Sequence, residues 1–225
     1  MREQSALREL ADDPTSRKRF LRMGGSGVAA SLAVFIAACG SDDKPAASGS
    51  KPKPATGDAP STSGTEQFGK GDLGIANYAL TLEYLETEFY ARAAEGGLLK
   101  GKVLETAKAF GQNEQEHVDA LTALIQKAGG KPASKPMARF PLEDEKSILE
   151  LAATVENLGA NAYLGQADKI ADKEILAAAL SIHSIEARHA AVLNEVTGKP
   201  PSPDAFAKPA SAAEVLKAVQ PFLVS

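Results

Sequence analysis

The fold of this chain is decided by residues 182–189, which read Ile-His-Ser-Ile-Glu-Ala-Arg-His. On an α-helix Glu186 and His189 lie three residues apart, so a carboxylate and an imidazole stand about one turn apart on one face. Apolar residues at helical spacing flank this pair, namely Ala179, Ile182, Ala190 and Leu193. Their pattern predicts that this face turns toward the core. Because a buried charge without a partner is costly, the pair predicts a cation inside the protein.

A second stretch, residues 110–118, repeats this arrangement with Glu114 three residues before His117. Apolar residues flank the second pair as well, at Phe110, Val118 and Leu121. The chain has only three histidines, and two of them stand in these two pairs. Two inward Glu-x-x-His pairs on two helices therefore predict one shared polar site in the core.

Two other segments each supply one further acid. Glu83 follows Ala-Leu-Thr-Leu, and Glu156 follows Ala-Ala-Thr-Val. A tyrosine follows each acid by seven residues, at Tyr90 and Tyr163, so acid and tyrosine share a helix face. The step from each acid to the glutamate of the next pair is 31 residues in the first half and 30 in the second. This correspondence predicts an internal duplication of a helical hairpin.

Helical periodicity interrupted by glycine and proline predicts four long helices, at residues 72–94, 102–127, 145–167 and 173–196. The proline-containing segment 131–144 has no periodicity and predicts an extended crossover along the length of a bundle. Ser211 to Glu214 reads as a capping box for a short amphipathic helix that packs on the outside. We therefore expect an all-α fold, with a four-helix bundle over residues 71–198 and a C-terminal extension with a short helix over residues 199–225.

Such a bundle brings four glutamates and two histidines together, namely Glu83, Glu114, His117, Glu156, Glu186 and His189. Carboxylate oxygens and imidazole nitrogens suit divalent iron or manganese. Four buried carboxylates would repel one another and shift toward protonation unless about four positive charges lay among them. The sequence therefore predicts a dinuclear metal centre.

These six residues resemble the ligand set of the ferritin-like di-iron carboxylate superfamily, in which two helices supply one Glu each and two supply Glu-x-x-His. Segments 77–86 and 113–117 are similar to helix openings in exported ferritin-like domain proteins of bacteria. The resemblance implies a ferritin-like four-helix bundle with two iron ions, or two manganese ions as the alternative. It fixes the reaction poorly, because one fold serves many functions.

Three further side chains have open roles. Tyr90 and Tyr163 either hydrogen-bond the ligand carboxylates from the second shell or are core aromatics with a satisfied hydroxyl. Glu86 lies about 60° around the helix from Glu83 and is an alternative ligand in its place. Symmetry favours Glu83, because the counterpart of Glu86 in the second half is Gly159.

The third histidine, His183, lies three residues before Glu186 at the edge of the same face. It is either a second-shell proton donor, a seventh ligand, or an ordinary, partly exposed helix histidine. Two neighbouring charged residues, Arg188 and Glu116, project away from the predicted core. We expect both to be solvated surface charges.

Residues 1–38 predict an export signal. A basic segment, residues 16–22, precedes an uncharged run, residues 23–38, that is too short for a comfortable spanning helix. The basic segment resembles a twin-arginine signal with Lys18 in the place of the second arginine. The run ends at Cys39 in a sequence that resembles a bacterial lipobox. Cys39 is therefore the predicted lipidated first residue of the mature protein, with an ordinary cleaved signal or an uncleaved anchor as alternatives.

Residues 39–70 are rich in Ser, Gly, Pro and Lys and offer little to bury, so we expect a flexible tether that holds the bundle at the cell envelope. Because Cys39 is the only cysteine, no internal disulfide is possible. Without residues 1–38 the chain carries 19 basic and 25 acidic residues, a net charge of −6. This balance argues against a nucleic-acid partner.

Three functions fit these features. The first is a di-iron or di-manganese oxidoreductase that acts on oxygen or peroxide, or that oxidises ferrous ion, with an electron donor that the sequence does not identify. The second is a metal-binding or stress-protective envelope protein without turnover. The third is a relic whose site takes no metal, which the presence of all six ligands disfavours.

Overall fold

The computed structural model describes residues 64–224, and within this range it is all-α, as predicted. Its four long helices are α3 (Gly71–Glu95), α4 (Gly101–Lys127), α5 (Glu145–Ala167) and α6 (Lys173–Val196). Each begins and ends within about one residue of the expected bounds. The predicted export signal, the lipidation site Cys39 and nearly all of the predicted tether lie outside the described residues.

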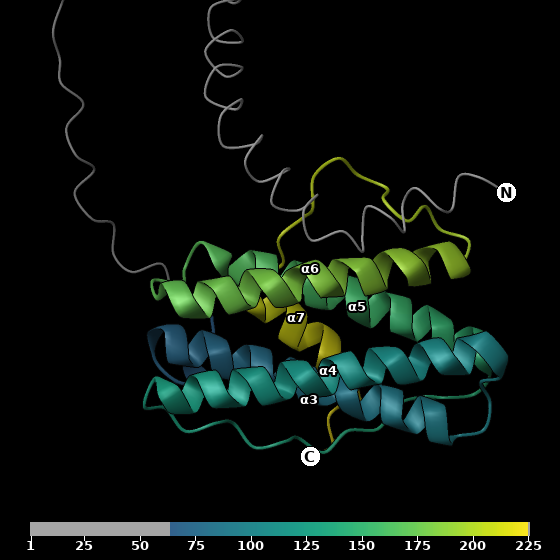
Figure 1. The fold of residues 1–225 in the computed structure, drawn as a ribbon, viewed down its shortest axis with the longest axis horizontal. Coiled ribbons are helices and arrows are strands. Elements are labelled where there is room, and N and C mark those ends of the chain that lie inside the picture. The colour runs from purple at the N-terminus through teal and green to yellow at the C-terminus, as the bar shows by residue number, and fades with distance from the viewer. Residues whose placement is uncertain (1–63, 225) are drawn as a thin grey trace, which may run out of the picture. The chain divides into compact units, whose positions relative to one another are not determined.

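The four helices form two antiparallel hairpins, α3 with α4 and α5 with α6, that pack against each other (Figure 1). The segment between α4 and α5 runs along the length of the bundle to the end where α4 began, so α5 runs in the same direction as α4 (Figure 1). This segment is the predicted long crossover. Its prolines suit an extended conformation, because proline disfavours the helix interior.

Local sequence signals explain where the helices begin and end. Asp144 caps α5 by accepting a hydrogen bond of 2.7 Å from the Ser147 amide. Asp172 caps α6 in the same way, with bonds to two amides. Gly129 and Gly198, just beyond α4 and α6, adopt left-handed φ angles of 77° and 76°, which glycine reaches without strain.

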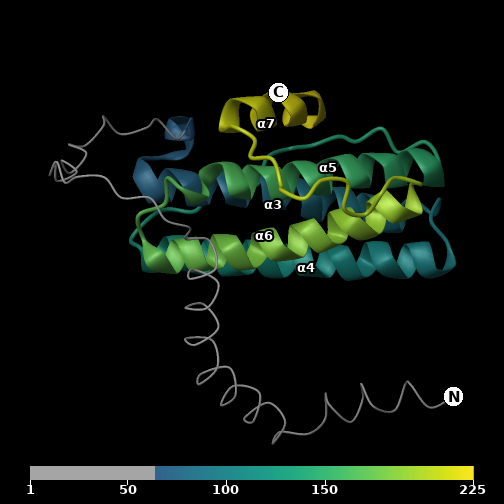
Figure 2. The same cartoon turned by 90° about the horizontal axis from the view of Figure 1, so that it is seen from above.

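A short C-terminal helix, α7 (Ala212–Val219), lies on the face formed by α3 and α5, away from α4 and α6 (Figure 2). The predicted capping box of Ser211 and Glu214 starts it. Ala212, Val215 and Val219 pack with apolar residues of α3 and α5. The 3-10 turn η2 (Gln220–Phe222) follows. Its Phe222 carbonyl accepts a hydrogen bond of 2.8 Å from the backbone amide of Arg139 in the crossover.

The packed structure begins a few residues before the expected boundary at residue 71. A 3-10 turn, η1 (Glu66–Phe68), precedes α3. Thr65 is fully buried, and the ring of Phe68 lies 5.7 Å from the ring of Tyr78. These residues belong to the segment predicted as a tether, and Phe68 offers one apolar side chain that offsets the cost of ordering a short turn.

Besides the cluster beneath α7, the described residues form two apolar clusters, one at each end of the bundle. One cluster lies where α3 and α6 begin and includes Ile75, Leu121 and Ile175. The other lies where α4 and α5 begin and includes Phe89 and Ile148. The layer between the clusters is polar. None of the described helices is long and apolar enough to cross a membrane.

Candidate metal centre

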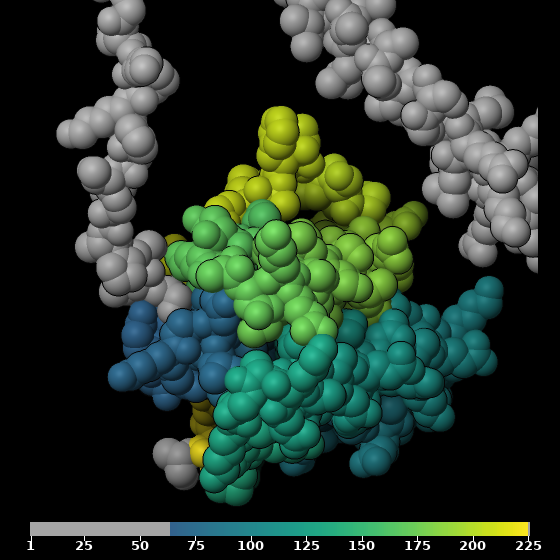
Figure 3. Space-filling model, turned by 60° about the vertical axis from the view of Figure 1, so that its left-hand side comes forward, coloured from purple at the N-terminus to yellow at the C-terminus, as the bar shows by residue number. Residues whose placement is uncertain are grey.

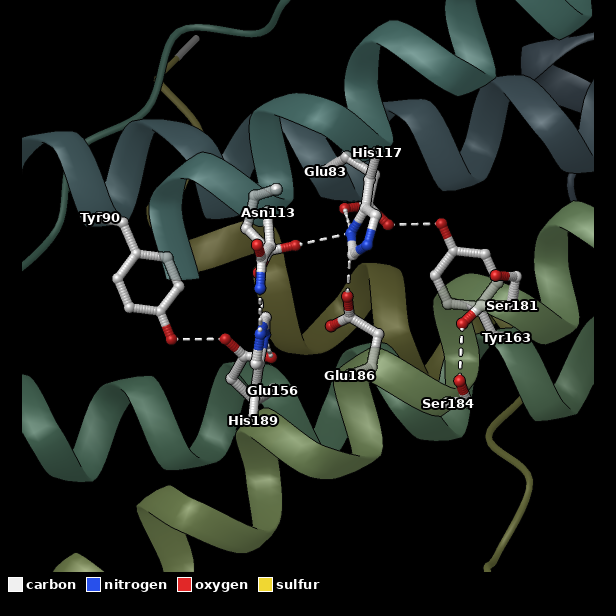
Figure 4. A network of polar contacts seen from close by, with 11 residues as sticks. Glu83, Tyr90, Asn113, His117, Glu156, Tyr163, Ser181, Ser184, Glu186 and His189 are labelled. Atoms are coloured by element: carbon white, nitrogen blue, oxygen red, sulfur yellow. Dashed lines mark hydrogen bonds and ion pairs between the residues drawn. The ribbon is translucent and has the colours of Figure 1, made fainter. Parts of the chain in front are cut away.

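The polar layer holds all six residues expected as ligands. Figure 4 labels all of them except Glu114. The four glutamate side chains are fully buried, and the two histidines are nearly so. They come from all four long helices: Glu83 from α3, Glu114 and His117 from α4, Glu156 from α5, and Glu186 and His189 from α6. The helical period placed each of them on the inward face of its own helix.

The six residues form two overlapping groups of donor atoms. One group contains Glu83 and His117, and the other contains Glu156 and His189. Glu114 and Glu186 belong to both. Within each group one donor atom per residue lies within 4.8 Å of the others. Two neighbouring cations sharing two carboxylates would match this arrangement.

The geometry of individual atoms also fits metal binding. Nδ1 of His189 lies 3.0 Å from a Glu114 oxygen and 3.3 Å from a Glu156 oxygen. Neither contact has the angles of a hydrogen bond, and this nitrogen has no hydrogen-bond partner among the described residues. Both carboxylate oxygens of Glu186 are also buried without a hydrogen bond among the described residues, although one of them lies 3.3 Å from Nδ1 of His117. Buried polar atoms are rarely left without a hydrogen bond, so donor atoms that converge in this way are compatible with a shared cation.

When no metal is bound, protonated histidines supply part of the positive charge that a cation would bring to the four carboxylates. Burial lowers the pKa of His117, but its close contacts with Glu114, Glu186 and Glu83 outweigh burial and raise this pKa to about 12. For His189, burial likewise lowers the pKa, and the nearby Glu114 and Glu156 carboxylates outweigh burial and raise it to about 9. Burial raises the pKa of Glu83 to about 7. Both imidazoles therefore carry a proton at neutral pH in the metal-free chain.

Metal binding is therefore expected to release protons, because only the neutral imidazole ligates a metal. Around pH 7, each proton displaced by the metal makes the apparent affinity for the metal rise about tenfold per pH unit. His189 stops contributing to this pH dependence above its pKa of about 9, because the imidazole is then already neutral. Isothermal titration calorimetry in two buffers of different protonation enthalpy measures the number of protons. Replacing His183 by glutamine should leave that number unchanged. Binding heats that do not depend on the buffer would contradict the expectation.

Each single-helix glutamate is held by a tyrosine of the opposite hairpin. Tyr90 of α3 donates a hydrogen bond to Glu156 of α5, and Tyr163 of α5 donates one to Glu83 of α3 (Figure 4). Burial raises the pKa of both tyrosines, so they remain neutral donors. The sequence left two roles open for these tyrosines. In the structure both hydrogen-bond the candidate ligand carboxylates. These bonds fix the orientation of both carboxylates.

Two side chains that the sequence pattern did not single out for this role hold the ring of His189. The Phe110 ring stacks on it, with centroids 3.8 Å apart and an angle of 20° between the planes. The side-chain amide of Asn113 lies 3.0 Å from Nε2 of His189 (Figure 4). These contacts turn Nδ1 toward the acids. From the sequence, only the position of Asn113 beside Glu114 pointed to this contact. The Asn113 side chain leaves the helix on a different face from that of Glu114, so the pattern of inward residues does not include it.

Glu86 is a fifth buried glutamate beside the candidate centre. Its side chain is only 3 % exposed, yet it belongs to neither donor group. A Cβ added at Gly159 would lie 2.9 Å from Oε1 of Glu86 and 2.8 Å from Oε2 of Glu186. The missing side chain of Gly159 thus leaves the space in which Glu86 approaches Glu186. Burial and the charge of Glu186 raise the pKa of Glu86 well above its usual range.

His183 has no contact with these acids in the described structure. It is half-buried, and its Nδ1 lies 2.9 Å from the Ala160 carbonyl oxygen, to which it donates when protonated there. This is the ordinary helix histidine among the three alternatives. Arg188 and Glu116 are exposed, as expected.

Comparison with known protein families matches residues 71–199 to the ferritin-like domain. Among solved structures, a conserved hypothetical protein of Mycobacterium tuberculosis has a TM-score of 0.52 at 18% identity, over 60% of this chain and 96% of its own. A hypothetical protein of Methanococcus jannaschii has a TM-score of 0.45 at 16% identity, over 64% and 91%. No curated protein matches. The family match spans all four long helices and the six candidate ligands, and the chain belongs to the ferritin-like domain family.

Proposed function

We propose that this chain is an exported ferritin-like protein that holds a dinuclear iron centre and reacts with dioxygen or hydrogen peroxide, or oxidises ferrous ion. The observation that carries the proposal is the pair of donor groups that share Glu114 and Glu186. Two neighbouring ions that share carboxylates can exchange electrons with one small oxidant. Manganese is the alternative metal, because the same oxygen and nitrogen donors suit it.

When bound, the two metal ions supply redox chemistry and polarise an O–O bond. The protein supplies the geometry. Glu83 and His117 would hold one ion, and Glu156 and His189 would hold the other. The tyrosine hydroxyls keep the two single-helix carboxylates in place. The surrounding apolar clusters exclude water from both ends of the centre.

Glu86 has a different part in this proposal. Its carboxyl group lies beside Glu186 without belonging to a donor group. A carboxyl group at this place can pass a proton to a molecule bound at the centre. Reduction of an O–O bond consumes protons, so we assign Glu86 the role of a proton donor.

Export and lipid anchoring belong to the same proposal and rest on the sequence of residues 1–38 and on Cys39. The protein would then work in the cell envelope, attached to the membrane by a lipid, with an electron donor of its own compartment. Replacing Cys39 by alanine should move the chain from the membrane fraction to the soluble fraction. Retention in the membrane fraction would contradict lipidation.

The function is tested on the full chain after loading with ferrous ion under anaerobic conditions. Metal analysis should give about two iron atoms per chain. Rapid mixing with dioxygen, or with peroxide, should produce a fast absorbance change and repeated turnover when reductant is added. Metal binding without turnover would support the alternative, a non-catalytic envelope protein. A folded chain that takes up neither iron nor manganese would overturn the metal centre.

A further inference from the structure

We propose that an apolar cavity at one end of the bundle binds dioxygen and leads it to the Glu156 and His189 half of the centre. This inference rests on the proposed function and selects one of its oxidants. The cavity has a volume of about 130 Å³ and lies where α4 and α5 begin and α3 and α6 end. The proposal depends on four features: the chemistry of the walls, their contact with the centre, the opposite end of the bundle, and the rim.

The walls of this cavity, which we call the Tyr90 cavity, are almost entirely aliphatic and aromatic. Only Tyr90, Lys102 and Thr106 among its lining residues carry a polar side-chain atom. Polar ligands find few partners there, whereas dry apolar cavities of about 150 Å³ accept guests such as xenon or benzene. Dioxygen is small and apolar and suits such a space. Hydrogen peroxide would lose hydrogen bonds to water on entering it.

The inner wall of the Tyr90 cavity touches the candidate metal centre. Tyr90 and Phe110 both line the cavity. The hydroxyl group of Tyr90 donates to Glu156, and the ring of Phe110 stacks on His189. Both contacted residues belong to the same donor group. A molecule in the cavity is therefore separated by one layer of side chains from one particular half of the centre.

The other end of the bundle has an equivalent cavity that is much smaller. The duplication pairs Tyr90 with Tyr163, and Tyr163 lines a cavity of only about 20 Å³. Other lining residues also correspond between the two cavities, as Ala107 with Ala179, Ala152 with Ala79, and Leu193 with Leu121. Side chains of α3, α4 and α6 meet over that end in the space-filling view (Figure 3). The two halves thus keep the same wall positions and differ in the space they enclose.

Two substitutions between the halves contribute to the difference in volume. Ala93 of the Tyr90 cavity corresponds to Gln166, and Val103 corresponds to Ile175, so the second cavity receives larger side chains. The two cavities therefore differ in size, and the Tyr90 end offers much more room for dioxygen.

The rim of the Tyr90 cavity gives access from the surface. Val192 and Val196 of α6 line the cavity and are 43 % and 54 % exposed. Apolar side chains at an opening favour the entry of an apolar molecule from water.

Xenon tests the cavity separately from the chemistry of the centre, because it binds apolar cavities without metal. Crystals of the full chain under xenon pressure should show xenon at the Tyr90 end and none behind Tyr163. Ala107→Leu, which fills the cavity, should remove it. Val103→Phe fills the cavity from another position and serves if Ala107→Leu does not fold. Ala109→Leu, on the exposed face of the same helix, is the matched control.

The reaction rates test the route. In iron-loaded chain, Ala107→Leu and Val103→Phe should slow the reaction with dioxygen roughly tenfold and leave that with peroxide within about twofold of the wild type. Ala109→Leu should change neither rate. Absence of xenon from the Tyr90 cavity would overturn this inference, and so would wild-type rates with dioxygen in both filled variants. If the same chain binds two iron atoms, the proposed function still stands. Xenon at the Tyr90 end of a chain that binds no metal would instead overturn the proposed function.

Discussion

Replacing Glu114 by glutamine is expected to leave the chain without bound metal. Glu114 belongs to both donor groups, so its loss affects both ions. The change keeps the shape of the side chain but removes its charge, and it replaces one carboxylate oxygen by an amide nitrogen that cannot ligate. Loss of an outer partner alone costs about 10–100-fold in metal affinity, and loss of a shared ligand should cost more. Metal analysis after gel filtration measures the result, and circular dichroism confirms that the helices remain.

Two matched variants sharpen this test. Glu116→Gln makes the same chemical change on the exposed face of α4 and should keep both ions. Glu86→Gln removes a buried acid that belongs to neither donor group, so it should also keep both ions. It should raise the melting temperature of the metal-free chain by about 3 °C, the effect of roughly 1 kcal/mol in a domain of this size. The reason is that Glu86 must take up a proton on folding at neutral pH, whereas glutamine need not. Full metal content in Glu114→Gln would show that the six residues do not form the centre.

Replacing Gly159 by alanine is expected to weaken metal binding at least about tenfold. In the middle of an exposed helix this change usually stabilises by up to about 1 kcal/mol. Here the new Cβ would meet Oε2 of Glu186 at 2.8 Å and Oε1 of Glu86 at 2.9 Å. The ends of both side chains can move away, so the fold survives while a shared donor leaves its position. Metal titration and thermal unfolding of the metal-free chain separate the two effects.

Gly111→Ala is the informative comparison. Its new Cβ would lie 2.9 Å from the Cβ of Tyr90, an atom fixed to the backbone of α3. The two helices must then move apart, so this variant should lower thermal stability by more than Gly159→Ala does. Unchanged metal affinity in Gly159→Ala would show that Glu186 does not need its present position to bind.

The six candidate ligands were predictable because they follow from the geometry of single helices. The period of about 3.6 residues decides whether Glu186 and His189 share a face, and the apolar neighbours decide whether this face is buried. The duplication then identified Glu83 and Glu156, which have no histidine beside them. The structure brings all six together in two overlapping groups.

Glu86 shows where this reasoning ends. In the sequence, the position that corresponds to Glu86 in the second half is Gly159. Because the second half has no equivalent acid, symmetry disfavoured Glu86 as a ligand. In the structure the same glycine is the reason that Glu86 is accommodated, since its missing side chain leaves room beside Glu186. An argument from symmetry compares positions along the chain, whereas steric space depends on which helix lies opposite.

The sequence by itself determined the helices, their inward faces, the crossover, the C-terminal helix and the six residues of the candidate centre. Only the tertiary structure decided that Tyr90 and Tyr163 reach across to the acid of the other hairpin and that Phe110 and Asn113 hold His189. It also decided that one of two equivalent cavities is much larger than the other. The physical reason is that helical periodicity fixes the direction of a side chain relative to its own axis. The distance, rotation and axial shift between two helices come from side-chain packing over the whole bundle.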